Sequence, residues 1–371
     1  MLSNTRVSAA SQRPLRVGLL GYGLAGRVFH APLIRACPGL ALAAVVTRSS
    51  ERRTALHAAC PEAVALETPD ELWARASQLG LDLVVVATPN RSHVSLAQAA
   101  LRAGLPVVVD KPLAPSAAEA RALIAEARTR GCLLTVFQNR RWDGDFLTLR
   151  RLLAEDALGA VRRFESRFER WSPAPRPGWR ESGDPAEAGG LLHDLGAHLV
   201  DQALLLFGPV RAVYAELDRR RPGVAVDDDV FVALAHASGT RAHLWMSKVA
   251  AQRGPRFRVL GERAAFTKHG LDGQEPAMAA GGVPGSPGWG EEPPERWGLV
   301  GEEGAARPVV TEAGAYLRFY EAVAAAVRGE APAPVDPEDA AAALDIIEAA
   351  RVSAERGRIV ELRATGARDQ G

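Results

Sequence analysis

Apolar runs and helix-like segments alternate along the first third of the chain. The apolar runs have the continuous hydrophobic character of buried parallel strands. They occupy residues 15–20, 40–46, 81–87, 106–109 and 132–137. Segments with helical periodicity, such as 91–103 and 116–130, lie between them. This alternation predicts a doubly wound parallel sheet over residues 15–138.

The pattern changes after residue 139. Strands of alternating polarity are predicted at 161–171, 210–217, 230–237, 242–249 and 257–260. Helices are predicted at 145–154, 188–207, 312–327 and 337–356. Hairpin-like connections such as Ser238-Gly239 favour an open, mostly antiparallel mixed sheet, backed by the helices. Residues 139–371 are therefore predicted to form a second domain, α+β in character, and 1–14 a flexible tail.

A long segment rich in Gly and Pro, residues 270–308, interrupts the second domain. Loops of this length inside a domain are usually functional or disordered. The sequence leaves open whether the segment is an ordered lid, an interface arm or a mobile loop.

A glycine turn follows the first predicted strand. Gly21, Gly23 and Gly26 have the G-x-G-x-x-G spacing between a strand and a helix. In such turns the first glycine permits the tight turn, the second lets the backbone approach a pyrophosphate, and the third lets the helix pack on the strand. Leu24 and Ala25 lie at the helix N-terminus, whose free N–H groups favour phosphate. The segment predicts the dinucleotide site of a Rossmann domain.

The end of the second strand bears on which dinucleotide binds. It reads Thr47-Arg48-Ser49, and the first acid is Glu51. An acid at this position suits the ribose 2′-hydroxyl of NAD, whereas an arginine suits the 2′-phosphate of NADP. Thr47 and Ser49 add hydroxyl donors. We therefore predict NADP(H) over NAD(H), against the alternative of a solvated Arg48 followed by a Ser49 helix cap.

Composition and charge narrow the class of protein. The 45 Lys and Arg residues nearly cancel the 44 Asp and Glu residues, so no nucleic-acid partner is indicated. No apolar run is long enough to span a bilayer, and the N-terminus lacks the apolar core of a signal peptide. The three cysteines are not in metal-ligand spacing, which favours buried thiols in a reducing compartment. We expect a cytoplasmic protein that binds no membrane and no metal.

Two further strand ends carry polar residues. Because ligands lie at the carboxyl ends of parallel strands, the residues after these ends are predicted to contact the cofactor. These residues are Thr88, Pro89 and Asn90 with the nearby His93, and Asp110 with Lys111. The Lys111 ammonium could hydrogen-bond a substrate hydroxyl and favour its deprotonation, or polarise a ketone in reverse. An ordinary exposed lysine in a loop is the alternative.

A helix of the second domain carries a carboxylate and an imidazole. Asp194 and His198 are four residues apart and so share one helix face. His198 titrates near neutral pH and suits the proton transfer that accompanies hydride transfer, while Asp194 could orient the ring or bind a second hydroxyl. Two alternatives remain: His198 as a satisfied core histidine, and a metal site that includes the adjacent His193.

Arginines beside tryptophans indicate a ligand surface. Such pairs bind anionic or polyhydroxylated ligands by forked hydrogen bonds and ring stacking. The predicted substrate-binding residues of this kind are Asn139, Arg140, Arg141 and Trp142, with Trp179 and Arg180. Arg–Asp pairs at a domain junction, with tryptophan packed between them, explain the first group equally well.

These motifs together resemble the Gfo/Idh/MocA family of NAD(P)-dependent oxidoreductases. The resemblance covers the chain from Leu15 to about Leu362 and rests on the glycine turn, the Asp110-Lys111-Pro112 turn and the Asp194/His198 helix. Some segments resemble the scyllo-inositol dehydrogenase-like branch. These are residues 139–146, 192–206, 270–275 and 287–290.

The resemblance implies roles for individual residues. Lys111 takes the place of the catalytic lysine, His198 of the general acid/base and Asp194 of the substrate-positioning partner. The family's turn usually reads Glu-Lys-Pro, so Asp110 departs from it by a shorter carboxylate. The implied activity is hydride transfer between NADP(H) and a ring alcohol or ketone of a cyclitol or sugar, in a homodimer or homotetramer. A non-catalytic dinucleotide-binding sensor on the same fold is the alternative.

Overall fold

The computed structural model describes residues 13–175 and 178–362. The predicted tail, residues 1–14, lies outside this range except for its last two residues. Arg13 pairs with Asp82 through two hydrogen bonds of 2.7 and 2.8 Å, beside the start of the first strand.

The first sheet has six parallel strands in the order β3-β2-β1-β4-β5-β6. This order is that of the Rossmann fold, which confirms the predicted doubly wound sheet. The strands are β1 (Leu15–Leu20), β2 (Leu40–Val46), β3 (Val64–Leu66), β4 (Leu83–Val86), β5 (Val107–Asp110) and β6 (Leu134–Phe137). Their apolar residues are almost entirely buried because helices cover both faces.

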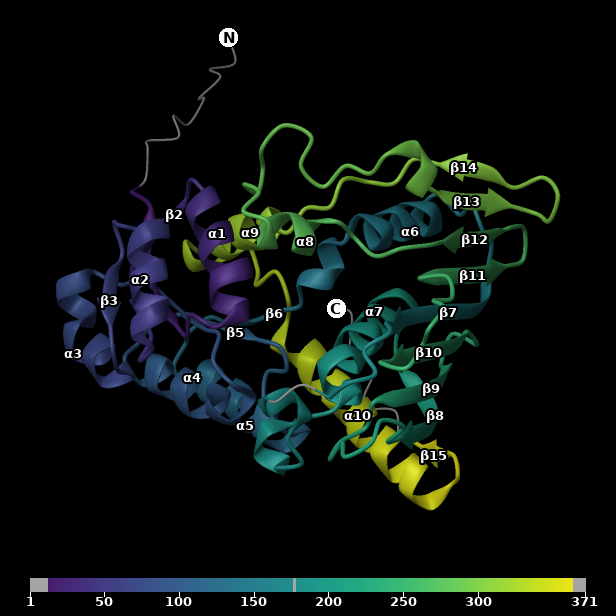
Figure 1. The fold of residues 1–371 in the computed structure, drawn as a ribbon, viewed down its shortest axis with the longest axis horizontal. Helices are drawn as coiled ribbons and strands as arrows, with labels where there is room; N and C mark the ends of the chain where they lie inside the picture. The colour runs from purple at the N-terminus through teal and green to yellow at the C-terminus, as the bar shows by residue number, and fades with distance from the viewer. Residues whose placement is uncertain (1–12, 176–177, 363–371) are drawn as a thin grey trace, which may run out of the picture.

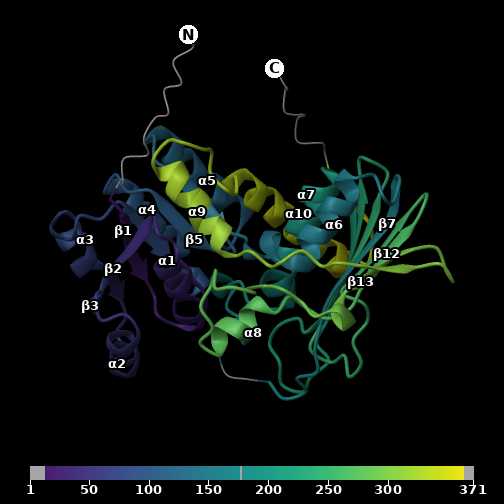
Figure 2. The same ribbon diagram turned by 90° about the horizontal axis from the view of Figure 1, so that it is seen from above.

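The helices of this half connect successive strands. In Figure 2, α4 and α5 lie on one side of the strands and α1 on the other. These helices are η1 (Ala25–His30), α1 (Ala31–Ala36), α2 (Ser50–Ala59), α3 (Pro69–Leu79), η2 (Asn90–Ser92), α4 (His93–Arg102) and α5 (Ala117–Thr129).

The second sheet has nine strands, in the order β14-β13-β12-β11-β7-β10-β9-β8-β15. β7 and β10 pair in parallel, and the other neighbours pair antiparallel, which confirms the predicted mixed sheet. The strands are β7 (Val161–Glu169), β8 (Val210–Asp218), β9 (Asp229–His236), β10 (Arg241–Ser247), β11 (Phe257–Gly261), β12 (Ala265–Lys268), β13 (Gly298–Gly301), β14 (Arg307–Val309) and β15 (Val360–Glu361).

Helices cover the face of this sheet that looks toward the first half. Figures 1 and 2 show α6, α7 and α10 between the two sheets. The helices of this part are η3 (Asn139–Trp142), α6 (Gly144–Ala154), η4 (Trp179–Glu181), η5 (Pro185–Glu187), η6 (Leu192–Gly196), α7 (Ala197–Phe207), α8 (Gln274–Ala279), η7 (Pro294–Arg296), α9 (Leu317–Val327) and α10 (Pro337–Arg356). The last helix also packs on α5, where the backbone N–H of Ala117 donates to Glu348 (2.7 Å). No helix among residues 13–175 and 178–362 is long and apolar enough to cross a membrane.

The Gly- and Pro-rich segment 270–308 is ordered against the second domain. It contains α8, η7, β13 and the turn toward β14, none of which the sequence predicted. The buried Lys268 ammonium pairs with Glu292 (2.9 Å) and donates to the carbonyl of Arg296 (2.9 Å). The Asp272 carboxylate accepts from the Gly144 N–H at the start of α6 (2.8 Å). These long-range bonds, rather than local periodicity, hold the segment in place.

Candidate active site

The glycine turn leaves room for a dinucleotide at the carboxyl ends of β1 and β4. Gly21 has a positive φ of +101°, and a Cβ there would lie 2.5 Å from the Ala87 carbonyl oxygen. A Cβ on Gly26 would lie inside the van der Waals radius of the Gly21 carbonyl oxygen, so this glycine sets the distance between helix and strand. A Cβ on Gly23 would meet only the tip of Arg52, at 3.8 Å. The open space at Gly23 is where a pyrophosphate fits.

Two arginines lie at the end of β2. Arg48 is exposed, and its side chain has no hydrogen bond or ion pair in the described part of the chain. Ser49 caps α2 by accepting from the Arg52 N–H (3.3 Å), and Thr47 is buried. The Arg52 side chain lies nearest to Gly23. Arg52 was not predicted as a site residue from the sequence, although its position one turn into the helix after Arg48 was a usable signal.

The turn after β4 is tied to the turn after β5. His93 Nδ1 lies 2.8 Å from the carbonyl oxygen of Pro112, and its Nε2 lies 2.9 Å from that of Thr88. The buried Asn90 amide donates to the Glu187 carbonyl of the second domain (2.8 Å). Pro89, between them, is exposed. These residues therefore hold the turns and the two domains together, and they do not line the cleft described below.

Lys111 directly follows β5, and the peptide bond between Lys111 and Pro112 is cis. Its ammonium donates to the Asp194 carbonyl oxygen (2.5 Å) and pairs with the Asp194 carboxylate (2.9 Å). The preceding Asp110 accepts from the Lys111 N–H (2.8 Å) and faces the buried His30 at 3.8 Å. Burial alone would raise the pKa of the Asp110 carboxyl, but His30 and Lys111 outweigh it and hold this pKa below its usual range.

The helix that carries Asp194 starts later than predicted. Residues 188–190 are not helical because Ala188 and Gly190 have positive φ angles of 45° and 94°. A Cβ on Gly190 would overlap the Asp227 carboxylate, which accepts from the Leu192 N–H at the helix start (2.7 Å). The first turn, Leu192–Gly196, is a π-helix, a form often found at functional sites. The glycine and the buried carboxylate thus fix where Asp194 lies.

Asp194 and His198 both face the cleft, as their spacing predicts. Burial alone would raise the pKa of the Asp194 carboxyl, but Lys111 and Arg180 outweigh it and keep this group ionised. Burial, together with Lys111 and Arg140, lowers the pKa of His198 well below its usual value. The His198 imidazole is therefore neutral at pH 7. Its Nδ1 is buried without a hydrogen-bond partner in the described structure, so Asp194 holds Lys111 rather than the ring.

The cluster at 139–142 divides between two environments. Asn139 and Arg140 line the cleft, and Arg140 donates to the Tyr316 hydroxyl (2.8 Å) and pairs with Glu275. Arg141 points away from the cleft into a buried ion pair with Asp201 (2.5 and 2.8 Å).

Trp142 does not line the cleft either. Its ring packs edge-on against Phe319, with centroids 5.5 Å apart. The domain-junction interpretation of the sequence thus describes Arg141 and Trp142, while the ligand-surface interpretation remains for Asn139 and Arg140.

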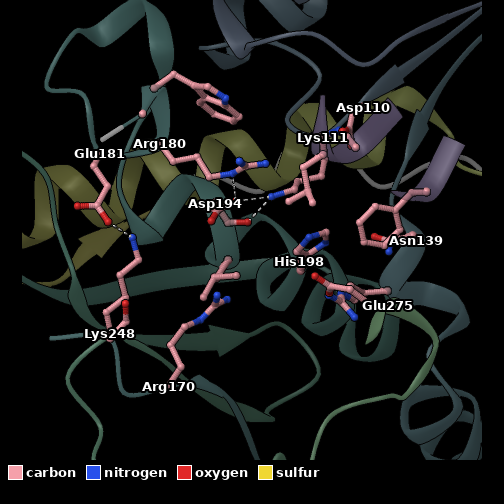
Figure 3. Close-up of a pocket in the computed structure, with 18 of the residues that line it drawn as sticks. Asp110, Lys111, Asn139, Arg170, Arg180, Glu181, Asp194, His198, Lys248 and Glu275 are labelled. Carbon is pink, nitrogen blue, oxygen red and sulfur yellow. Dashed lines mark hydrogen bonds and ion pairs between the residues drawn. The ribbon is translucent and has the colours of Figure 1, made fainter. Parts of the chain in front are cut away.

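The cleft itself lies between the two sheets and has a volume of about 660 Å³. Figure 3 shows Lys111 and Arg180 meeting at Asp194, with His198 beside them. Trp179 and Arg180, both predicted to bind substrate, line the cleft, and the Arg180 guanidinium stacks over the Trp179 ring at 4.3 Å. Other lining residues were not singled out from the sequence. They include Phe29, Phe137, Arg170, Trp171, Glu181, Lys248 and Glu275.

No metal site is formed by the described residues. Nowhere in residues 13–175 and 178–362 do three or more His, Cys, Asp or Glu side chains gather as ligands. The metal alternative requires His193. The Arg351 guanidinium donates a hydrogen bond to Nδ1 of this histidine (2.8 Å).

A dinucleotide-binding sheet joined by a polar cleft to a mixed sheet defines a two-domain, nucleotide-dependent oxidoreductase. Residues 15–138 match the oxidoreductase family with an NAD-binding Rossmann fold, and residues 146–267 match the GFO/IDH/MocA C-terminal domain. The chain belongs to the Gfo/Idh/MocA family of oxidoreductases.

Several relatives are similar over nearly their full length. The chain is 40% identical to the uncharacterised oxidoreductase YdgJ of Escherichia coli strain K12, over 90% of this chain and 94% of that protein. It is 34% identical to the scyllo-inositol 2-dehydrogenase (NADP(+)) IolW of Bacillus subtilis strain 168, over 94% and 96%. Among solved structures, yvaA from Bacillus subtilis superposes with a TM-score of 0.88 at 33% identity, covering 94% of this chain and 98% of that one.

Proposed function

We propose that this protein is an NADP-dependent oxidoreductase that interconverts a ring secondary alcohol and the corresponding ketone on a cyclitol or a sugar. The observation that carries the proposal is the contact of the Lys111 ammonium with Asp194, next to the neutral His198, at the open end of the dinucleotide site. A protein that only bound the nucleotide would need no such group of proton-transferring side chains.

The cofactor preference rests on the end of β2. The side chains of Arg48 and Arg52 are both exposed, and neither has an ion-pair partner in the described structure. Two free guanidinium groups near the ribose position favour a 2′-phosphate dianion, which accepts forked, charge-assisted hydrogen bonds. No acid occupies this strand end to hold a 2′-hydroxyl. NADP(H) is therefore the cofactor we propose, and IolW, the 34% identical relative, is named as NADP(+)-dependent.

The cleft residues account for the proton that accompanies hydride transfer. Bound NADP⁺ would supply the hydride acceptor for oxidation, and NADPH the donor for reduction. During oxidation the neutral His198 ring accepts the proton of the substrate hydroxyl. The Lys111 ammonium, held by Asp194, has a third N–H with which to stabilise the negative charge that develops on that oxygen. In the reverse direction His198 returns the proton.

The substrate class rests on the polarity of the cleft and on the relatives. Asn139, Arg140, Glu275 and Arg180 line it and offer both donors and acceptors, as a ring with several hydroxyls requires. The relative IolW is named as a scyllo-inositol 2-dehydrogenase. A cyclitol or sugar is accordingly the substrate we propose.

Spectrophotometry with a panel of cyclitols and aldoses tests the proposal. We expect reduction of NADP⁺ by at least one member, with a higher kcat/KM than for NAD⁺. Replacement of a positioned acid/base costs roughly 10²- to 10⁴-fold in rate, so His198→Asn should lose turnover and keep NADPH affinity. The His57→Asn variant, on the exposed surface of α2 and outside the cleft, is the matched control. If no member of the panel reduces NADP⁺ and the protein still binds NADPH, the result would favour a nucleotide-binding sensor.

We also propose that the two domains have different roles. Residues 15–138 bind the cofactor, and 139–371 bind the substrate and form a homodimer or homotetramer through the face of the nine-stranded sheet that the helices leave uncovered. This face carries Phe231, His243 and Trp245, whose rings contact one another in edge-on or tilted pairs. Sedimentation of the wild type and of Trp245→Glu tests the assembly, which we expect the substitution to weaken.

A further inference from the structure

One corner of the cleft carries more positive charge than its carboxylates neutralise. This cationic corner lies where β7 and β10 end, next to the Asp194 turn. Its three carboxylates are Glu181, Asp194 and Asp228, and its five cations are Lys111, Arg170, Arg180, Arg221 and Lys248.

Each of the three carboxylates already pairs with at least one of these cations. Asp228 pairs with Arg221 (2.8 Å). Glu181 accepts from Lys248 (2.8 Å) and from Arg221 (3.1 Å). The Asp194 carboxylate lies 2.9 Å from Lys111 but 3.5 Å from Arg180, so Arg180 is the weaker partner. The corner therefore retains about two uncompensated positive charges.

Arg170 is the cation without a partner. Its side chain makes no hydrogen bond or ion pair in residues 13–175 and 178–362. Its backbone is fixed, because its N–H donates to the Ser247 carbonyl (2.9 Å) and the next residue, Trp171, bridges to Val249. Figure 3 shows Arg170 reaching from the strand end toward the space around Asp194, where Arg180 and Lys111 meet. A fixed backbone with a free guanidinium that faces a cleft is suited to bind an anion.

The anion is not one of the cofactor's own phosphates. The part of the cleft that the glycine turn contributes is lined by Leu24, Ala25 and Phe29, none of which is charged. Arg48 and Arg52, which suit the 2′-phosphate, do not line the cleft. Apart from Lys111, the residues of the cationic corner belong to the second domain, on the substrate side.

We infer that the substrate carries an anionic substituent, a carboxylate or a phosphate monoester, which Arg170 and Arg180 bind in the cationic corner. This inference rests on the proposed function, since it names the substrate class of the same site. Planar guanidinium groups bind either anion through two parallel hydrogen bonds, and charge-assisted bonds of this kind discriminate strongly against a neutral analogue.

Matched neutral and anionic substrates test the inference. The probes are glucose against glucuronate and glucose 6-phosphate, and myo-inositol against its 1-phosphate, with NADP⁺ as acceptor. We expect kcat/KM to be at least tenfold higher for an anionic member than for its neutral counterpart. Comparison of glucuronate with the two phosphates shows whether carboxylate or phosphate is preferred. Arg170→Gln should lower kcat/KM for that member by about ten- to 150-fold and leave the neutral member within about twofold. Arg150→Gln, on the exposed side of α6 and outside the cleft, should change neither.

The outcomes separate this inference from the proposed function. Turnover of neutral polyols with no gain for the anionic members, or a gain that Arg170→Gln leaves intact, would overturn the inference alone. If no probe is turned over, calorimetric titration of glucuronate and glucose 6-phosphate into the NADPH-loaded protein decides. Binding that Arg170→Gln removes would support the anion site while the proposed function fails, and absence of binding would overturn the inference.

Discussion

Two glycines of the same turn should respond oppositely to one added methyl group. A Cβ on Gly23 meets nothing closer than Arg52 at 3.8 Å, and its φ is not positive, so Gly23→Ala should fold normally. We expect its free energy of unfolding to stay within about 0.5 kcal/mol of wild type. The methyl group, however, occupies the space in which the pyrophosphate approaches the backbone. Loss of one backbone hydrogen bond to a charged group costs about 1.5–3 kcal/mol, which weakens NADPH binding by about ten- to 150-fold.

Gly26→Ala should instead mainly lower the free energy of unfolding. Its Cβ would overlap the Gly21 carbonyl oxygen, a backbone atom that has no rotamer by which to move away. Overpacking of this kind costs about 1–3 kcal/mol, and the helix that carries the N–H groups must shift with it. Urea denaturation and titration of NADPH fluorescence measure the two quantities on the same samples. Wild-type affinity in Gly23→Ala, or wild-type stability in Gly26→Ala, would refute this assignment of the two glycines.

Three further substitutions test other parts of the structure. Arg48→Ser should lower the NADP⁺ to NAD⁺ ratio of kcat/KM by about tenfold or more, and an unchanged ratio would remove Arg48 from the 2′-phosphate site. Asp110→Glu lengthens the carboxylate toward the unpaired Nε2 of His30, now 3.8 Å away, and should raise the free energy of unfolding by about 1 kcal/mol; a loss would show that the shorter acid is the better fit. Burial first, then Arg351 and Lys111, lower the pKa of His193 to about 3. The unfolded chain therefore binds the extra proton between pH 3 and 6.5, and stability falls as pH falls through this window. At pH 5 the loss is about 2 kcal/mol, which His193→Asn should abolish when unfolding is compared at pH 5 and 7.

Most of the first sheet could be predicted because its strands are continuous apolar runs between helical segments. The five runs of the first half appear as β1, β2, β4, β5 and β6. β3 was missed because its three residues are too few to show any periodicity. β12, β13 and β14 are short as well, and distant partners hold them, including the Lys268–Glu292 pair.

The candidate site was only partly predictable for a related reason. Lys111, Asp194 and His198 stand at strand ends or helical spacings, which a sequence displays. Arg170 and Lys248 belong to predicted strands, but only the parallel pairing of β7 with β10 brings them to the same corner. Arg141 shows the opposite case. Next to Arg140 in the sequence, it turns into the buried pair with Asp201, which no local pattern reveals.

Transfer of deuterium from the substrate to the nicotinamide is the direct test of the proposed hydride transfer. A panel of cyclitols and sugars with deuterium on every ring carbon would be incubated with the enzyme and NADP⁺, and the reduced nicotinamide analysed by mass spectrometry. We expect NADPH that carries one deuterium from at least one ring alcohol, and loss of that transfer in His198→Asn. Absence of deuterium from the nicotinamide across the whole panel, with the cofactor bound, would contradict the proposed hydride transfer.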